Sequence, residues 1–379
     1  MVSEQMFGGF LGLVQNPAHL LMMALGGILL YLAIKKNIEP VLLLPIGLGV
    51  ILGNIPFSGV HEEGVGIFWL LNQIGLKTEM FPLLIFIGIG AMIDFGPLLE
   101  RPYTVLLGAA AQFGIFGTLL VALVLGFPLN QAAAIGIIGS ADGPTSIYVA
   151  ALLAPKLLAP IAVAAYSYMA LVPIIQPPIM RLLTTDAERK TRMSTRARPV
   201  SNTAKVLFPV VVILIAGLIA PMATPLIGFL MFGNLLRVSG VVERLSNAAQ
   251  NELVNITTIL LGITVGSTMT AGNFLNPDTV FTLQSPVFIF CLGMVAITLD
   301  TGAGLVFGKI MYYISGKKIN PLIGAAGISA FPMSARVVQR EGLRADPHNH
   351  LLMYAVGANT AGQIASVVAG GAVIALLSG

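Results

Sequence analysis

The segment GIIGSADGPTSIYVA, residues 136–150, places a single carboxylate, Asp142, in an apolar stretch that carries no other charge. Gly143 and Pro144 follow it directly, and both residue types interrupt helices. Non-helical backbone at membrane depth is tolerated only where protein buries it or water reaches it, and a charged group there is functional by default. The segment therefore predicts a broken membrane helix with an ion site. The alternative is a turn at the membrane surface, with Asp142 in water.

Composition supports the membrane setting. The chain has 379 residues, of which 56% are hydrophobic and only 9% are charged, and its mean hydropathy is +0.91. Soluble domains carry about 25% charged residues. The apolar runs are continuous and reach transmembrane length, whereas a β-barrel would show alternating segments of about ten residues. The sequence therefore predicts an all-α polytopic membrane protein, because helices satisfy their own backbone in lipid.

Charge and cysteine content exclude several function classes. The net charge of +4 is typical of a membrane protein with basic cytoplasmic loops. Aromatic residues are scarce and no stripe of basic and aromatic residues exists, so we expect no nucleic-acid partner. Cys291 is the only cysteine, which excludes an internal disulfide and a cysteine-ligated metal cluster.

Hydropathy divides the chain into membrane spans and two broken segments. Residues 1–16 predict an interfacial N-terminal segment. The segments 130–154 and 318–337 are apolar but interrupted by Gly and Pro, and 223–237 is apolar but short. Full spans are predicted near 18–34, 38–54, 79–98, 103–126, 157–180, 205–222, 251–270, 277–298 and 347–378.

One hydrophilic loop, residues 181–205, interrupts the apolar pattern near the middle of the chain. The positive-inside rule places this loop in the cytoplasm. We interpret it as a basic linker between a first half, 17–180, and a second half, 206–379. It holds seven of the twenty basic residues: Arg181, Arg189, Lys190, Arg192, Arg196, Arg198 and Lys205.

The two halves resemble each other. IGIIGSADGPTSIYVA, residues 135–150, matches IGAAGISAFPMSARVV, residues 323–338, at a spacing of 188 residues. Identities at this spacing include Gly136 with Gly324, Gly139 with Gly327, Pro144 with Pro332, and Ser146 with Ser334. Paired broken helices at matching positions are the sequence sign of a transporter-like core. We therefore predict two inverted repeats, each with a broken, re-entrant hairpin, whose tips meet near mid-membrane.

Hard oxygen ligands gather in the first broken segment. Ser140, Asp142, Thr145 and Ser146 supply hydroxyl and carboxylate oxygens within seven residues, and a broken helix adds free carbonyl groups. Such oxygens suit Na⁺ or H⁺.

The second broken segment has no acid, because Ala330 stands in the place of Asp142 at the 188-residue spacing. It offers Asn320, Ser329 and the cation Arg336 instead. Arg336 is either functional or an ordinary cytoplasmic anchor.

A third polar cluster lies within residues 354–370, in a run of Ala and Gly that otherwise reads as a span. Asn359 and Gln363 are four residues apart, so they share one helix face. They are either ion ligands or polar contacts between helices.

Two other acids stand beside glycines. Asp300, in AITLDTGAGLVFGK, is a further candidate ion ligand, whereas Asp94 lies close to Glu100 and Arg101 and is expected at the end of a span.

Five motifs in order resemble the β-subunit of the biotin-dependent sodium-pumping decarboxylases. These are GSADGPTSIY, YSYMALVPIIQPP, LDTGAGLVFGK, NPLIGAAGISAFPMSARV and YAVGANTAGQIASVVAGG, which together cover most of the chain. The family includes oxaloacetate, methylmalonyl-CoA and glutaconyl-CoA decarboxylases. The resemblance implies a subunit that decarboxylates carboxybiotin, consumes H⁺ and couples the reaction to Na⁺ export.

The resemblance also assigns roles to residues. It implies that Asp142 is the central Na⁺ and H⁺ carboxylate and that Tyr168, the second tyrosine of YSYM, is catalytic. Arg336 is implied to be catalytic too, and its guanidinium could hold the carboxylate of carboxybiotin.

The remaining family residues supply Na⁺ ligands and one glycine. The resemblance implies that Asn320, Ser329 and Asn359 bind Na⁺ together with Asp142, and that Gly324 is a structural glycine.

Partners and location follow from the same resemblance. The chain lacks the MKM signature of a biotin-bearing lysine, so carboxybiotin must arrive in trans on a biotin carrier subunit. A carboxyltransferase α-subunit, a small γ- or δ-type membrane subunit, an oligomeric assembly and the bacterial inner membrane are implied as well. The chain length favours an acyl-CoA decarboxylase over an oxaloacetate decarboxylase.

Two other functions fit the residues alone. One is a Na⁺-coupled organic-anion symporter without decarboxylase chemistry, and the other is a non-catalytic membrane scaffold. Release of CO₂ from carboxybiotin would separate the decarboxylase from both.

Overall fold

The computed structural model describes residues 8–37, 40–193, 199–275 and 285–377. Helices make up almost all regular structure in these ranges, and no strand occurs within them. Within these ranges, six helices are long and apolar enough to cross a membrane, or eight if each of two bent helix pairs forms one span. The prediction of an all-α polytopic membrane protein is confirmed.

The first half contains the helices up to the basic linker. In chain order they are α2 (Gly8–Gln15), α3 (Ala18–Lys36), α4 (Pro40–Gly53), α5 (Ile67–Leu71), η1 (Asn72–Lys77), α6 (Met80–Met92), α7 (Gly96–Glu100), α8 (Thr104–Ala111), α9 (Phe113–Val124), α10 (Leu129–Gly136), η2 (Ile137–Ser140), α11 (Gly143–Leu153), η3 (Pro155–Leu157) and α12 (Leu158–Leu183).

The linker contains the short helix α13 (Asp186–Arg189) and the first residues of α14 (Asn202–Ile219), which leads into the second half. The elements that follow are η4 (Pro221–Ala223), α15 (Thr224–Val238), α16 (Glu243–Ala248), η5 (Ala249–Leu253), α17 (Val254–Thr268), α18 (Ala271–Phe274), α20 (Pro286–Ile314), η6 (Pro321–Gly327), α21 (Met333–Ala345) and α22 (Leu352–Leu377).

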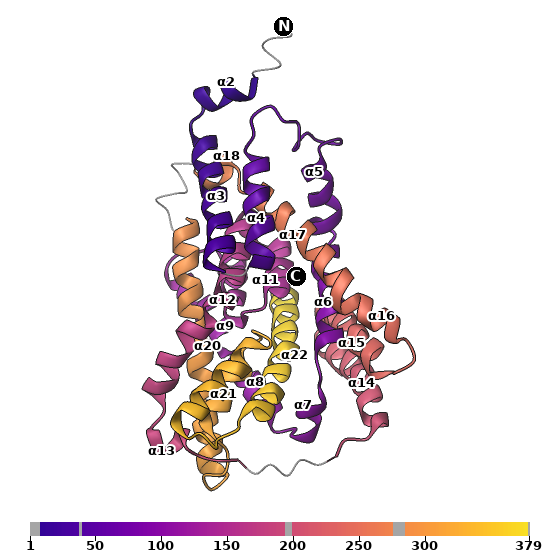
Figure 1. Ribbon diagram of the computed structural model, residues 1–379, viewed down its shortest axis with the longest axis vertical. Coiled ribbons are helices and arrows are strands. Elements are labelled where there is room, and N and C mark those ends of the chain that lie inside the picture. The colour runs from indigo at the N-terminus through magenta and orange to yellow at the C-terminus, as the bar shows by residue number, and fades with distance from the viewer. Residues whose placement is uncertain (1–7, 38–39, 194–198, 276–284, 378–379) are drawn as a thin grey trace.

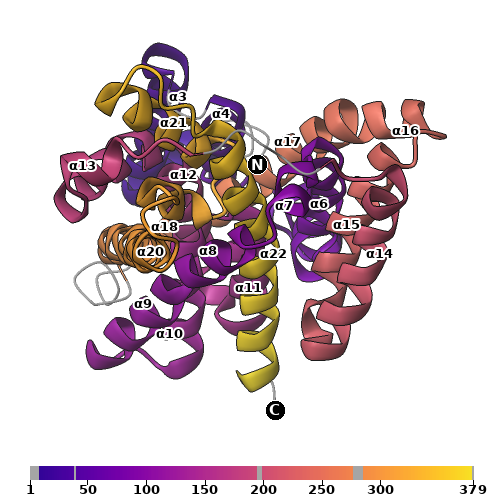
Figure 2. The same cartoon turned by 90° about the horizontal axis from the view of Figure 1, so that it is seen from below.

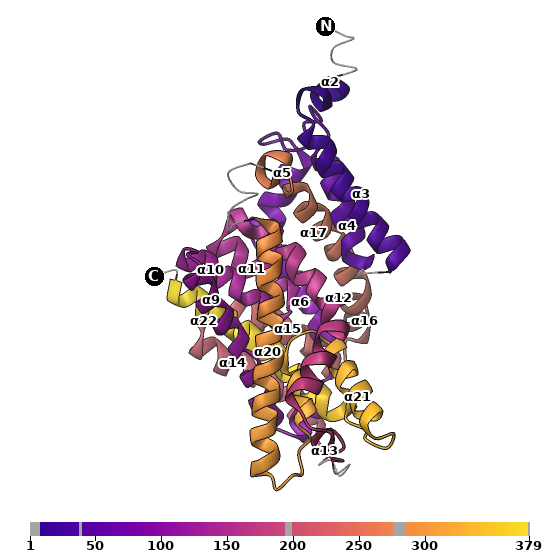
Figure 3. The same ribbon diagram turned by 90° about the vertical axis from the view of Figure 1, so that its left-hand side faces the viewer.

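The helices form two groups with α22 between them. Seen from below, α14, α15 and α16 lie on one side of α22, and α20, α9 and α13 lie on the other (Figure 2). The same helices are seen from the front in Figure 1. The longest helix, α20, stands along the side of the molecule that faces the viewer in Figure 3. Because α22 packs against α8, η6 and α21 and also against η4 and α15, it joins the two groups.

Small residues allow the closest helix contacts. A Cβ atom on Gly49 of α4 would lie 2.2 Å from the carbonyl oxygen of Ile263, and one on Gly266 of α17 would lie 2.1 Å from that of Ile46. The backbones of α4 and α17 therefore touch, as small residues permit in membrane helices. The same reciprocal contact joins α6 to α15.

The structure has a helix break in each of the two segments predicted to be broken. In the first, the 3₁₀ helix η2 ends at Ser140 and α11 begins at Gly143, so only Ala141 and Asp142 separate them. Ala141 takes the left-handed conformation, with φ of 53°, which ends the helix. In the second, residues 328–332 separate η6 from α21.

The first hairpin opens toward the start of α20. Its base carries Phe127, whose ring stacks on Phe288 at the N-terminal end of α20 with centroids 6.3 Å apart. The other end of α20 leads to Lys317 and Lys318 and to the basic linker. Helix α11 therefore runs from the tip at Asp142 away from the end of the molecule that carries the basic linker.

Four predicted spans differ from the structure. The span expected at 79–98 ends at Met92, because α6 has 13 residues and α7 follows as a separate short helix. The span expected at 277–298 is the helix α20, which runs on to Ile314, whereas residues 277–284 lie outside the described ranges. The helices α4 and α17 have 14 and 15 residues, fewer than the roughly 20 that cross a bilayer.

The N-terminal segment forms the short helix α2, which leaves Phe10 and Val14 largely exposed. Residues 1–7 of this segment lie outside the described ranges. Its interfacial role stays a prediction.

Candidate ion-binding site

The tips of the two broken hairpins touch. The backbone N–H of Ser329, in the second tip, donates to the carbonyl oxygen of Ser140, in the first, at 2.9 Å. Each helix break frees backbone groups that an intact helix would use internally. One of those freed carbonyls binds the other tip, so the segments that match in sequence also meet in space.

Asp142 is the carboxylate at this junction. It is the N-cap residue of α11, and its carboxylate accepts a hydrogen bond from the Thr145 hydroxyl at 2.6 Å. Pro144 fits in the first turn of α11, where no N–H is required of it. The Ser366 hydroxyl, from α22, donates to the same carboxylate oxygen at 3.1 Å. Asp142 is only 3% exposed, which is at odds with a turn in water.

One face of α22 lines the junction with polar groups. Asn359 and Gln363 are followed by Ser366 three residues later, so all three share a helix face. The amide nitrogen of Asn359 donates to the carbonyl of Ile328 at 2.6 Å, and that of Gln363 donates to the carbonyl of Ser329. The amide nitrogens of Asn359 and Gln363 therefore attach α22 to the second tip, which is the role expected of polar contacts between helices.

The amide oxygens of Asn359 and Gln363 remain without a hydrogen-bond partner among the described residues, although both are buried. The hydroxyl of Tyr166 is also buried and without a partner there. The Tyr166 ring lies against the start of α11, because a Cβ atom on Gly143 would stand 2.1 Å from it. Buried polar groups normally have partners. Three unpaired oxygens near one carboxylate therefore indicate a place for a cation.

The chemistry of this cluster favours a hard monovalent cation. None of the ion pairs in the described part of the chain includes Asp142. The described residues also contain no group of three His, Cys, Asp or Glu side chains that could bind a transition metal. One carboxylate surrounded by neutral hydroxyl, amide and carbonyl oxygens suits Na⁺ or H⁺.

Asn320 lies apart from this cluster. Its amide nitrogen donates to the carbonyls of Arg189 and Thr191 at 2.9 and 2.8 Å, and its amide oxygen caps η6 by accepting from Leu322. The seven residues of η6 span roughly 14 Å at the 3₁₀ rise and separate Asn320 from the tip at Ser329. The structure therefore uses Asn320 to attach the basic linker.

Gly324 occupies a position that requires glycine. A Cβ atom there would stand 1.9 Å from the carbonyl oxygen of Gly304, and one on Gly304 would stand 2.2 Å from that of Gly324. Helix α20 and η6 touch through their backbones at this point, which fits the predicted structural role.

Tyr168 and Arg336 are not brought to Asp142 either. The Tyr168 hydroxyl donates to the carbonyl of Phe290 on α20, and the two rings stack with centroids 4.8 Å apart. Arg336 lies in the first turn of α21, just after the second tip, and its side chain is exposed. No ion pair in the described part of the chain involves it.

The sequence reasoning missed two residues that the structure places beside Asp142. Ser366 lies one helical repeat after Asn359, at the i, i+7 spacing that marks a shared face. Tyr166 is two residues before Tyr168 on α12, and sequence alone does not decide which of the two faces the first hairpin.

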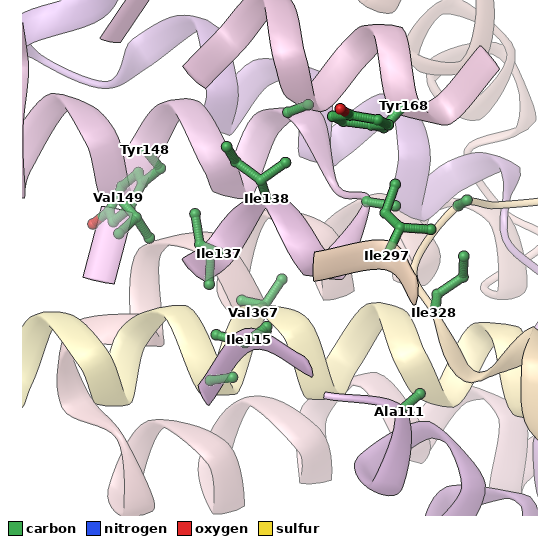
Figure 4. Packing of buried hydrophobic residues seen from close by; sticks show 14 of the residues in the cluster. Ala111, Ile115, Ile137, Ile138, Tyr148, Val149, Tyr168, Ile297, Ile328 and Val367 are labelled. Atoms are coloured by element: carbon green, nitrogen blue, oxygen red, sulfur yellow. The ribbon is translucent and has the colours of Figure 1, made fainter. Parts of the chain in front are cut away.

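Apolar side chains seal the junction. Ile137 of η2 lies close to Val367 of α22 and Ile115 of α9, whereas Ile138 lies on the side of Tyr168 (Figure 4). Ile328 belongs to the second tip. These side chains exclude water from most of the cluster, which strengthens electrostatic interactions inside it.

Two broken hairpins that meet around a buried carboxylate define a membrane protein that binds and moves a small cation. The comparisons with known proteins give the family. The model of the Na⁺-transporting oxaloacetate decarboxylase β-subunit family matches residues 18–377, and the chain belongs to that family.

Curated relatives carry related names. The chain is 53% identical to the glutaconyl-CoA decarboxylase subunit β of Acidaminococcus fermentans, over 94% of this chain and 93% of that protein. It is 51% identical to the methylmalonyl-CoA decarboxylase subunit β of Veillonella parvula, over 98% and 95%. It is 46% identical to the oxaloacetate decarboxylase β-chain of Klebsiella pneumoniae, over 97% and 96%.

Family membership therefore sets the activity. The protein is a multi-pass membrane subunit that takes part in decarboxylation coupled to Na⁺ transport, and a β-subunit works in a complex with other subunits. Of the three functions that the residues alone allow, the decarboxylase is the one that the family supports.

Proposed function

We propose that this chain decarboxylates carboxybiotin, delivered by a biotin carrier subunit, and exports Na⁺ through the cluster around Asp142. The observation that carries the proposal is a buried carboxylate without a cationic partner at the contact between two broken hairpins. The bacterial inner membrane is the proposed location, with a carboxyltransferase α-subunit and a small γ- or δ-type subunit as further partners.

The proposed Na⁺ ligands are oxygens of Asp142, Ser329 and Asn359. The buried, unpaired amide oxygen of Asn359 and the contact between the two tips support this set. Thr145 and Ser366 orient the carboxylate through their hydroxyl groups. Asn320 anchors the linker at the cytoplasmic end and leaves the ligand set.

The single negative charge of Asp142 can couple decarboxylation to Na⁺ export. Removal of CO₂ from carboxybiotin consumes a proton, and Asp142 holds either H⁺ or Na⁺. Binding of the one cation weakens binding of the other to the same extent, because coupling between sites is reciprocal. A proton taken up for the reaction therefore empties the site of Na⁺.

Arg336 is proposed to attract the carboxylate of carboxybiotin. Its guanidinium is exposed at the start of α21 and follows the second tip directly. Guanidinium groups form strong, charge-assisted hydrogen bonds with carboxylates. An exposed cation fits a group that arrives on a partner subunit. Tyr168 stays a proposed catalytic residue on the resemblance alone.

The helix contacts support the proposed inverted repeat. Gly49 and Ile46 on α4 correspond to Gly233 and Leu230 on α15 at a spacing of 184 residues, four fewer than the spacing that relates the two broken hairpins. The α6–α15 contact repeats the α4–α17 contact: Cβ atoms on Gly90 and Gly233 would lie 1.8 and 1.9 Å from the carbonyl oxygens of Leu230 and Ile87. A two-fold relation that exchanges α4 with α15 and α6 with α17 would produce this pair of contacts.

Decarboxylation by the reconstituted complex tests the proposed function. The wild-type complex should release CO₂ from free carboxybiotin in a Na⁺-dependent manner, and Asp142→Asn should abolish this release because an amide cannot exchange H⁺ for Na⁺. Asp94→Asn is a matched control, since Asp94 is exposed and caps α7 through Gly96. Wild-type activity and Na⁺ dependence in Asp142→Asn would refute the assignment.

A further inference from the structure

Each broken hairpin is touched by one polar side chain at the same position of the repeat. Gly139 and Gly327 are equivalent at the 188-residue spacing. Gln112, between α8 and α9, donates to the carbonyl of Gly327 at 3.2 Å. The equivalent of Gln112 at this spacing is Asp300 on α20. The Oδ2 atom of Asp300 lies 2.8 Å from the point where a Cβ atom on Gly139 would stand.

The two equivalent side chains differ in how they are paired. The Gln112 amide nitrogen also donates to the carbonyl of Gly108 at 3.0 Å, so its hydrogens are satisfied. Asp300 is 0% exposed, yet neither of its carboxylate oxygens receives a hydrogen bond from a described side chain. It also forms no ion pair within the described ranges. A buried ionised carboxylate requires a partner.

The start of α9 packs directly against Asp300, because a Cβ atom on Gly114 would stand 2.1 Å from its Oδ1 atom. The backbone amides of Gly114 and Ile115, in the first turn of α9, face it. Thr118, four residues after Gly114, lies on the same face of α9, and its hydroxyl is buried without a partner among the described residues. The amide oxygen of Gln112 is also buried and unpaired there.

No titratable side chain of the elements packed against α20 is available to pair with the Asp300 carboxyl group. The elements α8, α9, η2 and η6, which pack against α20, contain no titratable side chain. Helix α12, the other close neighbour, carries Tyr166, Tyr168 and, at its end, Arg181. Arg181 is occupied by a two-pronged ion pair with Glu341.

We propose that Asp300 is a second Na⁺-binding carboxylate, located on α20 against the first broken hairpin. The inference rests on the proposed function in one respect: the ion is taken to be the one that the complex transports. Since Gly139 lies three residues before Asp142, a cation at Asp300 borders the segment that carries the first site. The alternative is that the Asp300 carboxyl group is protonated and neutral, with a structural role equivalent to that of the Gln112 amide.

Asparagine at position 300 separates the two readings, because it keeps the shape and removes the charge. We expect the reconstituted Asp300→Asn complex to export about half as much ²²Na⁺ per CO₂ released as wild type. The Na⁺ dependence of its decarboxylation should also become less steep. Asp94→Asn serves as the matched control at an exposed carboxylate, and it should export as much ²²Na⁺ per CO₂ released as wild type. An unchanged ratio in Asp300→Asn would overturn the proposal.

A chemical probe gives the same information without a variant at position 300. A hydrophobic carbodiimide reacts with buried protonated carboxyl groups, and mass spectrometry identifies the modified peptide. Na⁺, but not K⁺ at equal ionic strength, should protect Asp300. The protection should persist in Asp142→Asn, where it cannot arise from the first site. Modification of Asp300 at the same rate with and without Na⁺ would overturn the proposal, whatever the folding yield of Asp300→Asn.

The two proposals fail in different ways. A wild-type complex that releases no CO₂ from carboxybiotin would refute the proposed function. A wild-type complex that decarboxylates and exports Na⁺, with an unchanged export ratio in Asp300→Asn, would refute the second site alone.

Discussion

Removal of the Ser366 hydroxyl should weaken Na⁺ binding while leaving the fold intact. The single Ser366 hydroxyl proton is within reach of two acceptors, the Asp142 carboxylate at 3.1 Å and the carbonyl of Gln363, within its own helix, at 3.0 Å. Ser366→Ala deletes one buried donor and leaves α22 with a strong helix former. The contact to Asp142 is the only one that links α22 side chains to this carboxylate in the described part of the chain.

The magnitude follows from the charge on Asp142. A hydrogen bond to a charged group contributes about 1.5–3 kcal/mol, and about 1.4 kcal/mol corresponds to a factor of ten. The variant loses this stabilisation of the ionised carboxylate, so H⁺ competes more strongly with Na⁺. At a pH where the empty site is protonated, the Na⁺ concentration for half-maximal decarboxylation should therefore rise by a factor of up to about 10 to 100.

The assay is the initial rate of CO₂ release by the reconstituted complex at constant ionic strength, with K⁺ replacing Na⁺. Ser267→Ala is the matched control, because Ser267 is buried in α17 and its hydroxyl donates only within its own helix, to Thr264. The control should keep the wild-type Na⁺ dependence. A wild-type half-saturation in Ser366→Ala would show that this hydroxyl does not stabilise the ion-binding form.

Three further results are expected. Tyr166→Phe should alter the Na⁺ dependence of decarboxylation, because the Tyr166 hydroxyl is buried near Asp142 and has no hydrogen-bond partner among the described residues. An unaltered Na⁺ dependence would show that Tyr166 is not part of the site. Arg192→Ala should expose the basic linker to proteolysis, because Arg192 binds Asp346 through two hydrogen bonds of 2.5 and 3.0 Å. The same pairing lowers the pKa of Asp346 from 3.8 to about 2. This stabilisation is complete above about pH 4 and is lost as the pH falls toward 2, so protease sensitivity of the linker should increase only in that acid range.

The first broken hairpin could be predicted because its signal is local. Gly143 and Pro144 interrupt a helix by their own backbone properties, and Asp142 supplies the N-cap that α11 needs. The end of α20 could not be predicted in the same way. Asp300 and Lys309 resemble the end of a span, yet Asp300 is buried and Lys309 reaches the carbonyl of Leu183 at the linker.

The position of each candidate site residue in the fold is harder to predict than the motif to which it belongs. The resemblance places Asn320 and Ser329 in one motif, but η6 separates them and turns Asn320 toward the linker. Ser366 stands in a run of small residues, where a hydroxyl has no local feature that distinguishes it from a packing residue. Only the approach of α22 to the first tip shows that it contacts Asp142.

The dependence of Na⁺ affinity on pH tests the central claim, that Na⁺ and H⁺ compete for Asp142. Charged pairs beside the basic linker do not interfere, because Arg181 lowers the pKa of Glu341 and Arg192 lowers that of Asp346. Both carboxylates therefore stay ionised above about pH 5.

The measurement is the Na⁺ concentration for half-maximal decarboxylation by the wild-type complex between about pH 5.5 and 8.5. Reciprocal coupling at one carboxylate predicts that this concentration rises as the pH falls, approaching about tenfold per pH unit where the empty site is protonated. A Na⁺ requirement that stays constant across the whole range would contradict competition at Asp142.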